Sequence, residues 1–443
     1  MQSKLEFLRV TLQFSLENPT VVKQQLLLWS QQYHEVVWLD SNNYHAQNSE
    51  FDAILAVDAL TLLQTDYIQA FQKLNEYQQT TNDWIFGYLS YDLKNDVEHL
   101  ISQNYDGLHF PELYFFQPKK VFLLKGNILE VQYLKVIDDE LEADIQEIFN
   151  TKIDAELFTH KDSNKEYRPK IKLRIHKDEY HEKVTKLLEH IHRGDIYEAN
   201  FCQEFYAENA EIDPLSTYTH LNAISKPPFA TYMRLSDKYI LSASPERYIK
   251  KKGTKITSQP IKGTAKRSTD ILEDQQLIEN LQNDEKERAE NIMIVDLVRN
   301  DLAKTAVKGS VQVEELCKIY TFDQVHQMIS TVVSEVTENQ NPVAILQTTF
   351  PMGSMTGAPK ISAMQIIENL EETKRGIYSG AIGYFTPNND FDFNVVIRSI
   401  LYNSSKKYVS YSVGGAITAK SIPEKEYEEC LIKAKAMREV LEN

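Results

Sequence analysis

Two segments of the sequence each carry a pair of glutamates three residues apart, Glu287 with Glu290 and Glu426 with Glu429. Both segments have helical patterns, over 284–304 and 421–441, so each pair is expected to share one helix face. Carboxylates ~4 Å apart repel each other by about 4 kcal/mol at an effective dielectric of ~20, and a hard divalent cation such as Mg²⁺ removes that repulsion. The spacing is therefore compatible with a Mg²⁺ site, although such pairs also occur as solvated surface charges.

A lysine and a further glutamate stand in neighbouring strand-like segments. Lys262 lies between Pro260 and Gly263 in SQPIKGTAKR (258–267), and Glu246 lies in SPER (244–247). A hairpin would bring the two side chains close together. A lysine becomes a nucleophile when burial or a neighbouring cation lowers its pKa, but a lysine at a strand end is ordinarily solvated. The residues alone leave both interpretations open.

Two glycine-rich segments indicate close approach of the backbone to a ligand. FPMGSMTGAPKISAM (350–364) leads into a helix, whose first backbone N–H groups suit an anion. Its spacing fits neither a nucleotide P-loop nor a dinucleotide fingerprint. YSVGGAITA (411–419) ends a strand with Gly414 and Gly415, which leave room for a ligand. Ordinary turns are the alternative for both segments.

The elements that must position these residues are predicted from hydrophobic patterning. Alternating or short apolar runs at 36–40, 51–57, 84–92, 120–134 and 196–207 predict strands, with a hairpin turn at 126–127. Segment 178–194 predicts a helix that ends at Gly194. Long antiparallel strands alternating with helices indicate an α+β fold in which helices cover large sheets. We expect an N-terminal segment at 1–165, a charged connection within 138–170, and a catalytic domain at 171–443.

Composition excludes several classes of protein. The 443 residues have a formal net charge of −16, which repels nucleic acid and anionic lipid. The three cysteines, Cys202, Cys317 and Cys430, form no CxxC pair, which argues against a zinc site and a disulfide framework. No apolar run approaches the ~18 residues of a membrane helix, and the N-terminus is unlike a signal peptide. The sequence thus predicts a soluble cytoplasmic protein with no nucleic-acid or membrane partner.

Nine segments, in order over most of 190–440, resemble the chorismate-utilising family, which includes anthranilate, aminodeoxychorismate, isochorismate and salicylate synthases. The resemblance is carried by GDIYEANFCQEF, SASPERYIK, QPIKGTAKR, DEKERAENIMIVDLVRNDL, VHQMISTV, FPMGSMTGAPKISAMQIIENLE, RGIYSGAIGYF, DFNVVIRSIL and SIPEKEYEECLIKAKA. The N-terminal part matches more weakly, chiefly through GYLSYDLKNDVEHL (87–100). The resemblance implies the fold of anthranilate synthase component I, in which large antiparallel sheets form a central sandwich covered by helices.

The resemblance also assigns roles to residues. It implies that Glu290 and Glu429 bind Mg²⁺, supported by Glu287 and Glu426, and that the ion holds the ring carboxylate of chorismate. Glu246 would be the general acid that assists departure of the 4-hydroxyl group. The remaining substrate contacts would come from Arg398, Tyr378, Gly414 and Gly415 at the enolpyruvyl carboxylate, and from His326, Ser354 and Thr264 around the ring.

The residue between Ile and Gly in the PI-x-GT motif separates activities within the family. Anthranilate synthases resemble each other in having alanine there, whereas aminodeoxychorismate synthases carry lysine, as this chain does at Lys262. The implied reaction is amination of chorismate at carbon 4, through attack of the Lys262 amine on carbon 2. Water-adding members place a lysine where this chain has Glu198, and most amine-adding members have glutamine there. The alternatives are an anthranilate synthase with an incidental Lys262, and a non-catalytic chorismate-binding scaffold.

Two further expectations concern binding partners. None of the three cysteines lies in a Gly-x-Cys-x-Gly turn, so we expect ammonia from a separate glutamine amidotransferase subunit. Family members often hold tryptophan in the N-terminal segment, as an inhibitor or as a structural ligand. VVWLDSNNY (36–44) would line such a pocket through Ser41.

Overall fold

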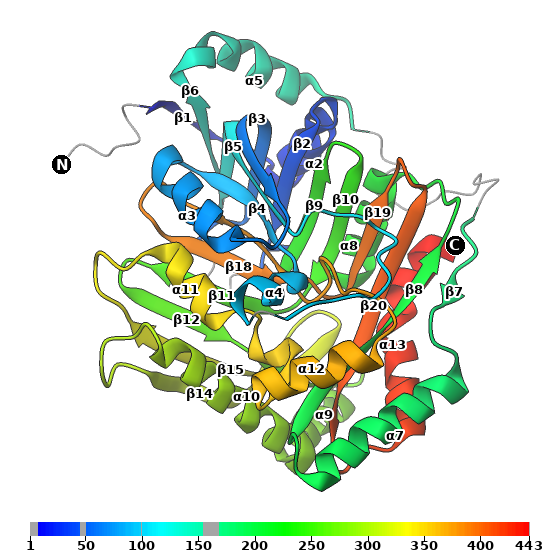
Figure 1. Cartoon of the computed structure of the whole chain (residues 1–443). Coiled ribbons are helices and arrows are strands. Elements are labelled where there is room, and N and C mark those ends of the chain that lie inside the picture. Colours follow the sequence, from blue (N-terminus) through cyan, green and yellow to red (C-terminus); the bar gives the residue numbers. More distant parts are fainter. Residues whose placement is uncertain (1–7, 45–49, 99, 154–167, 443) are drawn as a thin grey trace.

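A computed structural model describes residues 8–44, 50–98, 100–153 and 168–442 (Figure 1). All ladders between the named strands are antiparallel, and they join into two broad sheets that share strand β5 (Leu113–Lys125). The part of β5 near Leu113 pairs with β4 (Ile85–Leu89), and the part near Lys125 pairs with β6 (Ile128–Leu134). The two sheets diverge from this long strand and enclose a core between them.

The first sheet runs in the order β1–β6–β5–β3–β2–β9–β10–β19–β20–β8, with β7 and β16 beside β8. Besides β5 and β6, its strands are β1 (Arg9–Ser15), β2 (Glu35–Asp40), β3 (Ala53–Thr65), β7 (Lys172–Leu173), β8 (Glu198–Ala207), β9 (Phe229–Leu235), β10 (Lys238–Ser244), β16 (Gly357–Ala358), β19 (Ser399–Asn403) and β20 (Tyr408–Thr418).

The second sheet continues from β5 through β4, β17, β18, β11, β12 and β15, and β15 then pairs with both β13 and β14. These strands are β11 (Arg247–Lys252), β12 (Lys255–Gln259), β13 (Ile261–Lys266), β14 (Gln312–Thr321), β15 (Val325–Glu335), β17 (Ala381–Phe385) and β18 (Phe391–Val395). Apolar residues of both sheets, among them Phe86, Met233, Ile382 and Leu401, form one buried cluster. The sheets therefore pack face to face as a sandwich.

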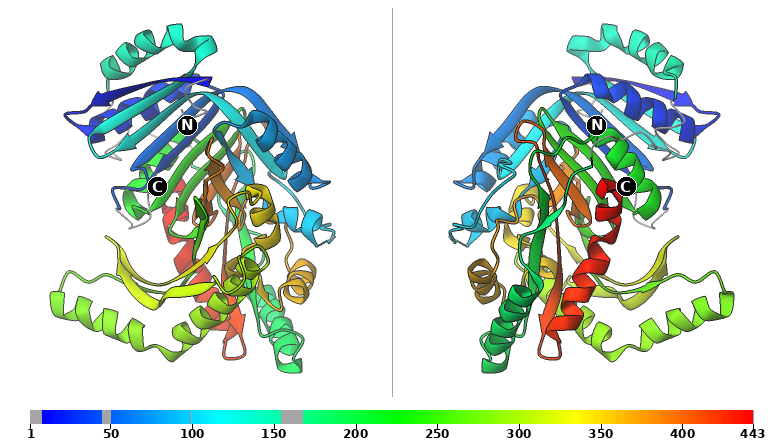
Figure 2. Two further views of the ribbon diagram at one scale, coloured as in Figure 1. Left: turned by 90° about the vertical axis from the view of Figure 1, so that its left-hand side faces the viewer. Right: turned by 90° about the vertical axis from the view of Figure 1, so that its right-hand side faces the viewer.

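Helices cover the outer faces of the sandwich (Figures 1 and 2). On the first sheet these are α2 (Pro19–Trp29), α5 (Leu141–Asn150), α7 (Lys177–Arg193), α8 (Pro214–Ser225) and α13 (Pro423–Glu442). On the second they are α3 (Ala70–Thr81), α10 (Glu285–Ala303) and α11 (Pro342–Thr349). The remaining helices are α4 (Lys94–Val97), α9 (Ile271–Asn283), α12 (Lys360–Leu370), and the short 3₁₀ turns η1 (Ser30–Gln32), η2 (Tyr91–Leu93), η3 (Lys135–Glu140) and η4 (Gly353–Met355).

The predicted α+β fold with a helix-covered antiparallel sandwich is confirmed. The predicted helix at 178–194 is α7, and it ends at Gly194, whose φ of 88° is the left-handed conformation that glycine adopts readily. The strand predicted at 51–57 extends to Thr65, because the whole of β3 pairs with β5. No helix among the described residues is both long and apolar enough to cross a membrane.

The N-terminal segment contributes strands to both sheets. Strand β2 pairs with β9, and β4 pairs with β17, so backbone hydrogen bonds join residues on either side of the expected boundary at 165–171. The expected connection at 138–170 begins within η3 and includes helix α5, and its residues 154–167 lie outside the described part. Folding of the sandwich thus requires both segments.

Candidate functional site

Lys262 lies between three glutamates that come from separate elements. Its Nζ donates a hydrogen bond to Oε1 of Glu198, at the start of β8, over 3.3 Å. The carboxylates of Glu246, between β10 and β11, and of Glu290, on α10, also act on its charge. The Lys262 side chain is only 12% exposed. The fold therefore places this lysine in a buried, acidic environment rather than at a solvated strand end.

These acids determine the charge of the Lys262 amine. Burial alone would lower its pKa, but the carboxylates of Glu198, Glu290 and Glu246 together raise it. The expectation from the sequence was that a nucleophilic lysine would have a lowered pKa, and the structure shows the opposite direction. The resting amine is an ammonium ion that must lose a proton before it can attack.

Glu246 has the opposite protonation preference. Its side chain is 4% exposed, and its Oε1 accepts a hydrogen bond of 2.7 Å from the hydroxyl of Ser354, in η4. Burial raises the pKa of Glu246 to about 7, although Ser354 and the charge of Lys262 act to lower it. A carboxyl that is partly protonated near neutral pH suits the predicted general acid.

The four glutamates of the two Glu-x-x-Glu segments come from α10 and α13, with lysines between and beside them. Lys286 lies 3.8 Å from Oε1 of Glu290 and 3.9 Å from Oε1 of Glu426. The Nζ of Lys433 lies 2.6 Å from Oε1 of Glu429. Helix α13 runs along β20 (Figure 1). Side-chain oxygens of Glu426 and Glu429 lie beside Gly415 of that strand. Helices that are distant in the sequence thus contribute to one acidic surface.

The donor chemistry of this surface fits a divalent cation. Burial raises the pKa of Glu290 to about 7 and raises the pKa values of Glu287 and Glu426. Oε1 of Glu290 is buried and accepts no hydrogen bond from the described residues, although the ammonium of Lys286 lies 3.8 Å away. Burial also opposes ionisation of Glu429, but the ammonium of Lys433 keeps the pKa of that carboxyl low. Among the described residues, no three Asp, Glu, His or Cys side chains converge closely enough to hold a metal ion as they stand. Mg²⁺ binding by these residues therefore stays a prediction.

A cavity of about 240 Å³ is bounded on one side by Ala436 and Met437 of α13, the helix that carries Glu426 and Glu429. Its wall includes Thr264 from β13, Gln327 from β15 and Arg398, the residue before β19. The guanidinium of Arg398 donates one hydrogen bond to the backbone oxygen of Lys433 over 3.1 Å, and burial lowers its pKa. Tyr378 is close enough to act on the charge of Arg398. The cavity thus has an arginine in its wall, as expected of a site for a small carboxylate, whereas Tyr378 is not one of its lining residues.

One predicted substrate contact, His326, lies on the opposite side of its sheet from Thr264. His326 is fully buried and lies opposite Ala265, whereas Gln327 lies opposite Thr264. Because neighbouring residues of a strand face opposite sides, His326 points away from the face with Thr264. Its ring nitrogens bond Asp274 and Thr321 instead.

The two glycines of β20 differ in their surroundings. A Cβ on Gly414 would lie 2.4 Å from the backbone oxygen of Phe201, so this glycine permits the pairing of β20 with β8. A Cβ on Gly415 would instead lie 3.4 Å from Oε2 of Glu426 and 3.6 Å from Oε1 of Glu429. Only Gly415 therefore faces the acidic surface.

Three residues of the site were missed by the sequence analysis. Lys286 precedes Glu290 by four residues and Lys433 follows Glu429 by four, a helical spacing that signals an ion pair. Gln327 follows the expected His326 directly, and only the strand register distinguishes the two. The four-residue spacing could therefore have predicted the two lysines as partners of the glutamates, whereas no local pattern predicted Gln327.

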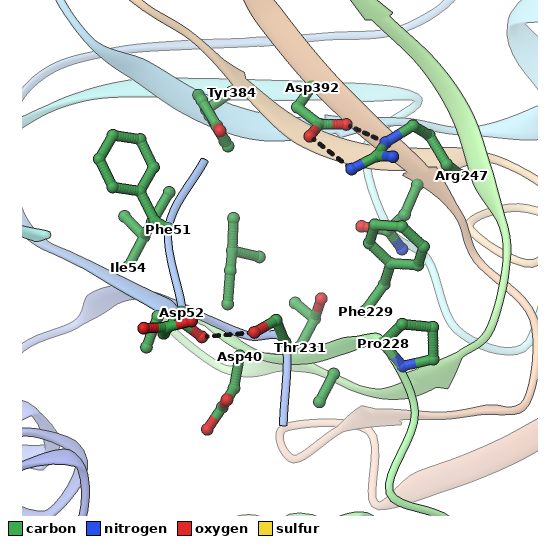
Figure 3. Close-up of a pocket in the computed structure, with 15 residues that line it drawn as sticks. Asp40, Phe51, Asp52, Ile54, Pro228, Phe229, Thr231, Arg247, Tyr384 and Asp392 are labelled. Carbon is green, nitrogen blue, oxygen red and sulfur yellow. Dashed lines mark hydrogen bonds and ion pairs between the residues drawn. The ribbon is translucent and has the colours of Figure 1, made fainter. Parts of the chain in front are cut away.

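Ser41 lines a second, smaller cavity of about 60 Å³ between the two sheets (Figure 3). Apolar side chains, including Phe51 and Phe229, face an ion pair in which Arg247 donates two hydrogen bonds to Asp392, over 3.0 and 3.1 Å. The hydroxyl of Ser41 donates to the backbone oxygen of Asp52. Tryptophan binding in this cavity stays a prediction, which calorimetric titration of the chain with tryptophan would check.

The arrangement of an acidic surface, a buried lysine and an arginine-lined cavity agrees with the family to which the sequence is related. The family profile described as chorismate binding enzyme matches residues 25–439. The chain belongs to this family.

Its relatives divide between two names. It is 32% identical to aminodeoxychorismate synthase component 1 of Bacillus subtilis over 369 residues, which cover 80% of this chain and 76% of the relative. It is 39% identical to the Escherichia coli protein of that name over 266 residues, covering 60% of this chain and 58% of the relative. It is also 34% identical to anthranilate synthase component 1 of Aquifex aeolicus over 368 residues, covering 81% and 74%.

Two solved structures show the same fold. Anthranilate synthase component I from Streptococcus pneumoniae superposes with a TM-score of 0.75 at 24% identity, covering 87% of this chain and 91% of that one. The menaquinone-specific isochorismate synthase MenF from Escherichia coli has a TM-score of 0.75 at 17% identity, covering 98% and 94%. These similarities establish the architecture, and the choice among reactions depends on the residues of the site.

Proposed function

We propose that this chain aminates chorismate to give 4-amino-4-deoxychorismate, the precursor of 4-aminobenzoate and folate. The observation that supports this reaction over the others is the position of Lys262, whose amine is buried among Glu198, Glu246 and Glu290. Aminodeoxychorismate synthases carry lysine at this position of the PI-x-GT motif. Several relatives at 32–40% identity bear that name.

In the proposed reaction Lys262 and Glu246 act on opposite ends of a conjugated system. The Lys262 amine attacks carbon 2 of the ring, the two ring double bonds shift, and the bond from carbon 4 to its hydroxyl oxygen breaks. Glu246, protonated near neutral pH, gives its proton to that oxygen, which leaves as water. Ammonia then adds at carbon 4, the double bonds shift back, and Lys262 is expelled. The enolpyruvyl group is retained.

The other residues hold the substrate and the ion. Arg398 and Tyr378 would bind the enolpyruvyl carboxylate. Gly415, which has no side chain, would leave room for that carboxylate beside β20. Glu290 and Glu429, with Glu287 and Glu426, would hold Mg²⁺. When bound, this ion would neutralise the carboxylates and orient the ring carboxylate of chorismate.

The proposal includes a separate glutamine amidotransferase as the source of ammonia. A glutaminase of this kind needs a reactive thiolate, and all three cysteines of this chain are buried. Burial raises the pKa of Cys202 to about 12 and also raises the pKa values of Cys317 and Cys430. Thiols in such surroundings are poor nucleophiles at neutral pH, which supports an external supply.

A product assay tests the proposal. The purified chain is incubated with chorismate, Mg²⁺ and an ammonium salt, and the products are separated by chromatography and identified by mass. Aminodeoxychorismate, convertible to 4-aminobenzoate by an added lyase, is the expected product. Anthranilate with pyruvate would favour the second candidate, which the names of relatives such as the Aquifex aeolicus protein support. No turnover, together with binding of chorismate, would favour a scaffold.

A further inference from the structure

Lys286 lies between carboxylates that come from two different helices. Its Nζ is 3.8 Å from Oε1 of Glu290, one turn further along α10, and 3.9 Å from Oε1 of Glu426 on α13. The two glutamate side chains are 10% and 4% exposed, and Oε1 of Glu290 accepts no hydrogen bond from a described residue. Buried anionic oxygens on separate helices repel each other, so a cation between them stabilises the folded chain.

The ammonium of Lys286 is held loosely by these carboxylates. Both distances exceed the length of a hydrogen bond, so the attraction is electrostatic and has no fixed direction. The side chain is 42% exposed, which leaves it a path to solvent. Lys433 differs, because its Nζ lies 2.6 Å from Oε1 of Glu429 and also donates a hydrogen bond of 2.8 Å to the backbone oxygen of Gly414. Of the two lysines, Lys286 is therefore the one that can leave its carboxylates without breaking a hydrogen bond.

Lys286 meets the same carboxylates on which the predicted metal site depends. Its charge is influenced by all four glutamates of the two Glu-x-x-Glu pairs, most by Glu290 and next by Glu426. A divalent cation bound to this surface would need the oxygens of the same side chains. Two cations that are attracted to the same oxygens repel each other, so the binding of one disfavours the other.

We propose that the ammonium of Lys286 is an internal counter-ion that competes with Mg²⁺ for Glu290 and Glu426 and so limits the affinity of the chain for that ion. This inference rests on the proposed function, in which these carboxylates hold Mg²⁺. For the ion to bind, the ammonium has to move from between the two helices to solvent. That displacement lowers the apparent affinity for Mg²⁺, in the way that any unfavourable conformational step lowers the apparent affinity of a ligand.

The test measures Mg²⁺ binding directly, by isothermal titration calorimetry of the whole chain after treatment with EDTA and gel filtration, without chorismate. Lys286→Met removes the charge and keeps an unbranched side chain of similar length, whereas Lys286→Arg keeps the charge. Lys435→Met is the matched control, because Lys435 is an exposed lysine on the helix that carries Glu426. Circular dichroism follows the thermal unfolding of each protein with and without Mg²⁺.

We expect Lys286→Met to lower the dissociation constant for Mg²⁺ by about tenfold, because the ion no longer has to displace a cation. Without Mg²⁺ this variant should melt at a lower temperature than the original chain, since the carboxylates of α10 and α13 lose their counter-ion. Saturating Mg²⁺ should remove that difference. Lys286→Arg and Lys435→Met should bind Mg²⁺ with dissociation constants within about twofold of the original value.

Two results would overturn the inference while leaving the proposed function intact. One is a dissociation constant for Mg²⁺ that is unchanged or higher in Lys286→Met, together with a melting temperature that is lowered equally with and without the ion, as a purely structural role requires. The other is an equal tightening in Lys435→Met, which indicates a general effect of net charge. If the original chain binds no Mg²⁺ at all, the metal site of the proposed function fails and this inference fails with it, whereas the product assay tests the amination independently.

Discussion

The hydroxyl of Ser354 donates a hydrogen bond of 2.7 Å to Oε1 of Glu246, and both side chains are almost completely buried. The serine comes from η4, in the glycine-rich segment before α12, and the glutamate from the bend between β10 and β11. The bond stabilises the ionised carboxylate, whereas burial disfavours it. The balance between the two sets the pH at which Glu246 can donate a proton.

The first prediction concerns the pH dependence of activity. Because burial raises the pKa of Glu246 to about 7, the acid form required for catalysis is lost above that pH. We expect kcat/KM to fall by about tenfold per pH unit on the alkaline side of this value. Ser354→Ala removes the bond that lowers the pKa, so the descending limb should move to higher pH. A limb at the same pH in both proteins would show that Ser354 does not tune this acid.

The second prediction concerns stability. A carboxyl whose pKa is raised in the folded state favours folding when it is protonated, and this contribution is lost as the pH rises from about 4.5 to about 7. Glu246→Gln has no such ionisation. Relative to this variant, the original chain should lose about 3 kcal/mol of unfolding free energy across that interval. Chemical denaturation of both proteins at pH 4.5 and pH 8 measures the difference, and parallel pH profiles would contradict it.

The third prediction concerns Lys262. Lys262→Ala should lower kcat for aminodeoxychorismate by on the order of 10³-fold or more, because the covalent route is closed. Lys262→Arg is the matched control, since it keeps the positive charge beside Glu198 but provides no nucleophile. Both variants should be inactive and form no adduct visible by mass. Unchanged turnover of Lys262→Ala with anthranilate as the product would favour anthranilate synthase, in which this lysine is incidental.

The fourth prediction concerns the metal. Glu290→Gln and Glu429→Gln should each abolish Mg²⁺-dependent turnover and leave the fold intact, since each removes one anionic oxygen donor. Mg²⁺ with chorismate should raise the melting temperature of the original chain but not of these variants. Glu428→Gln, an exposed change on the same helix, is the control. Near-normal rates in both site variants would exclude these carboxylates as metal ligands.

The fifth prediction separates the two glycines of β20. Gly414→Ala places a Cβ 2.4 Å from the backbone oxygen of Phe201, so it should destabilise the fold by on the order of 1–3 kcal/mol. Gly415→Ala meets only side-chain atoms of Glu426, Glu429 and Lys433 at 3.4 Å or more, so the chain should fold normally. Its effect should appear as a higher KM for chorismate. Thermal melting and steady-state kinetics of both variants distinguish these outcomes.

Local patterns in the sequence were sufficient for the elements of the fold. Helix α7 and its end at Gly194 follow from apolar spacing and a left-handed glycine, which are properties of neighbouring residues. The two Glu-x-x-Glu segments are helical as predicted, on α10 and α13. Nine motifs, in the order found in the family, predicted the family and with it the antiparallel sandwich.

Contacts between distant segments were decided by the tertiary structure. The pairing of β2 with β9 and of β4 with β17 merges the N-terminal segment into the same sheets, and no local pattern encodes such partners. The register of β13 against β15 directs Gln327, rather than His326, to the side of Thr264, because a shift of one residue reverses every side chain.

The charge of Lys262 shows the same division most clearly. The sequence determined that a lysine stands in this motif, together with the types of acid available to it. Only the fold brought Glu198, Glu246 and Glu290 around its amine, and this raised its pKa where burial alone would have lowered it. Electrostatic effects depend on distances across the folded molecule, so residue types gave the components of the site and the tertiary structure gave their protonation.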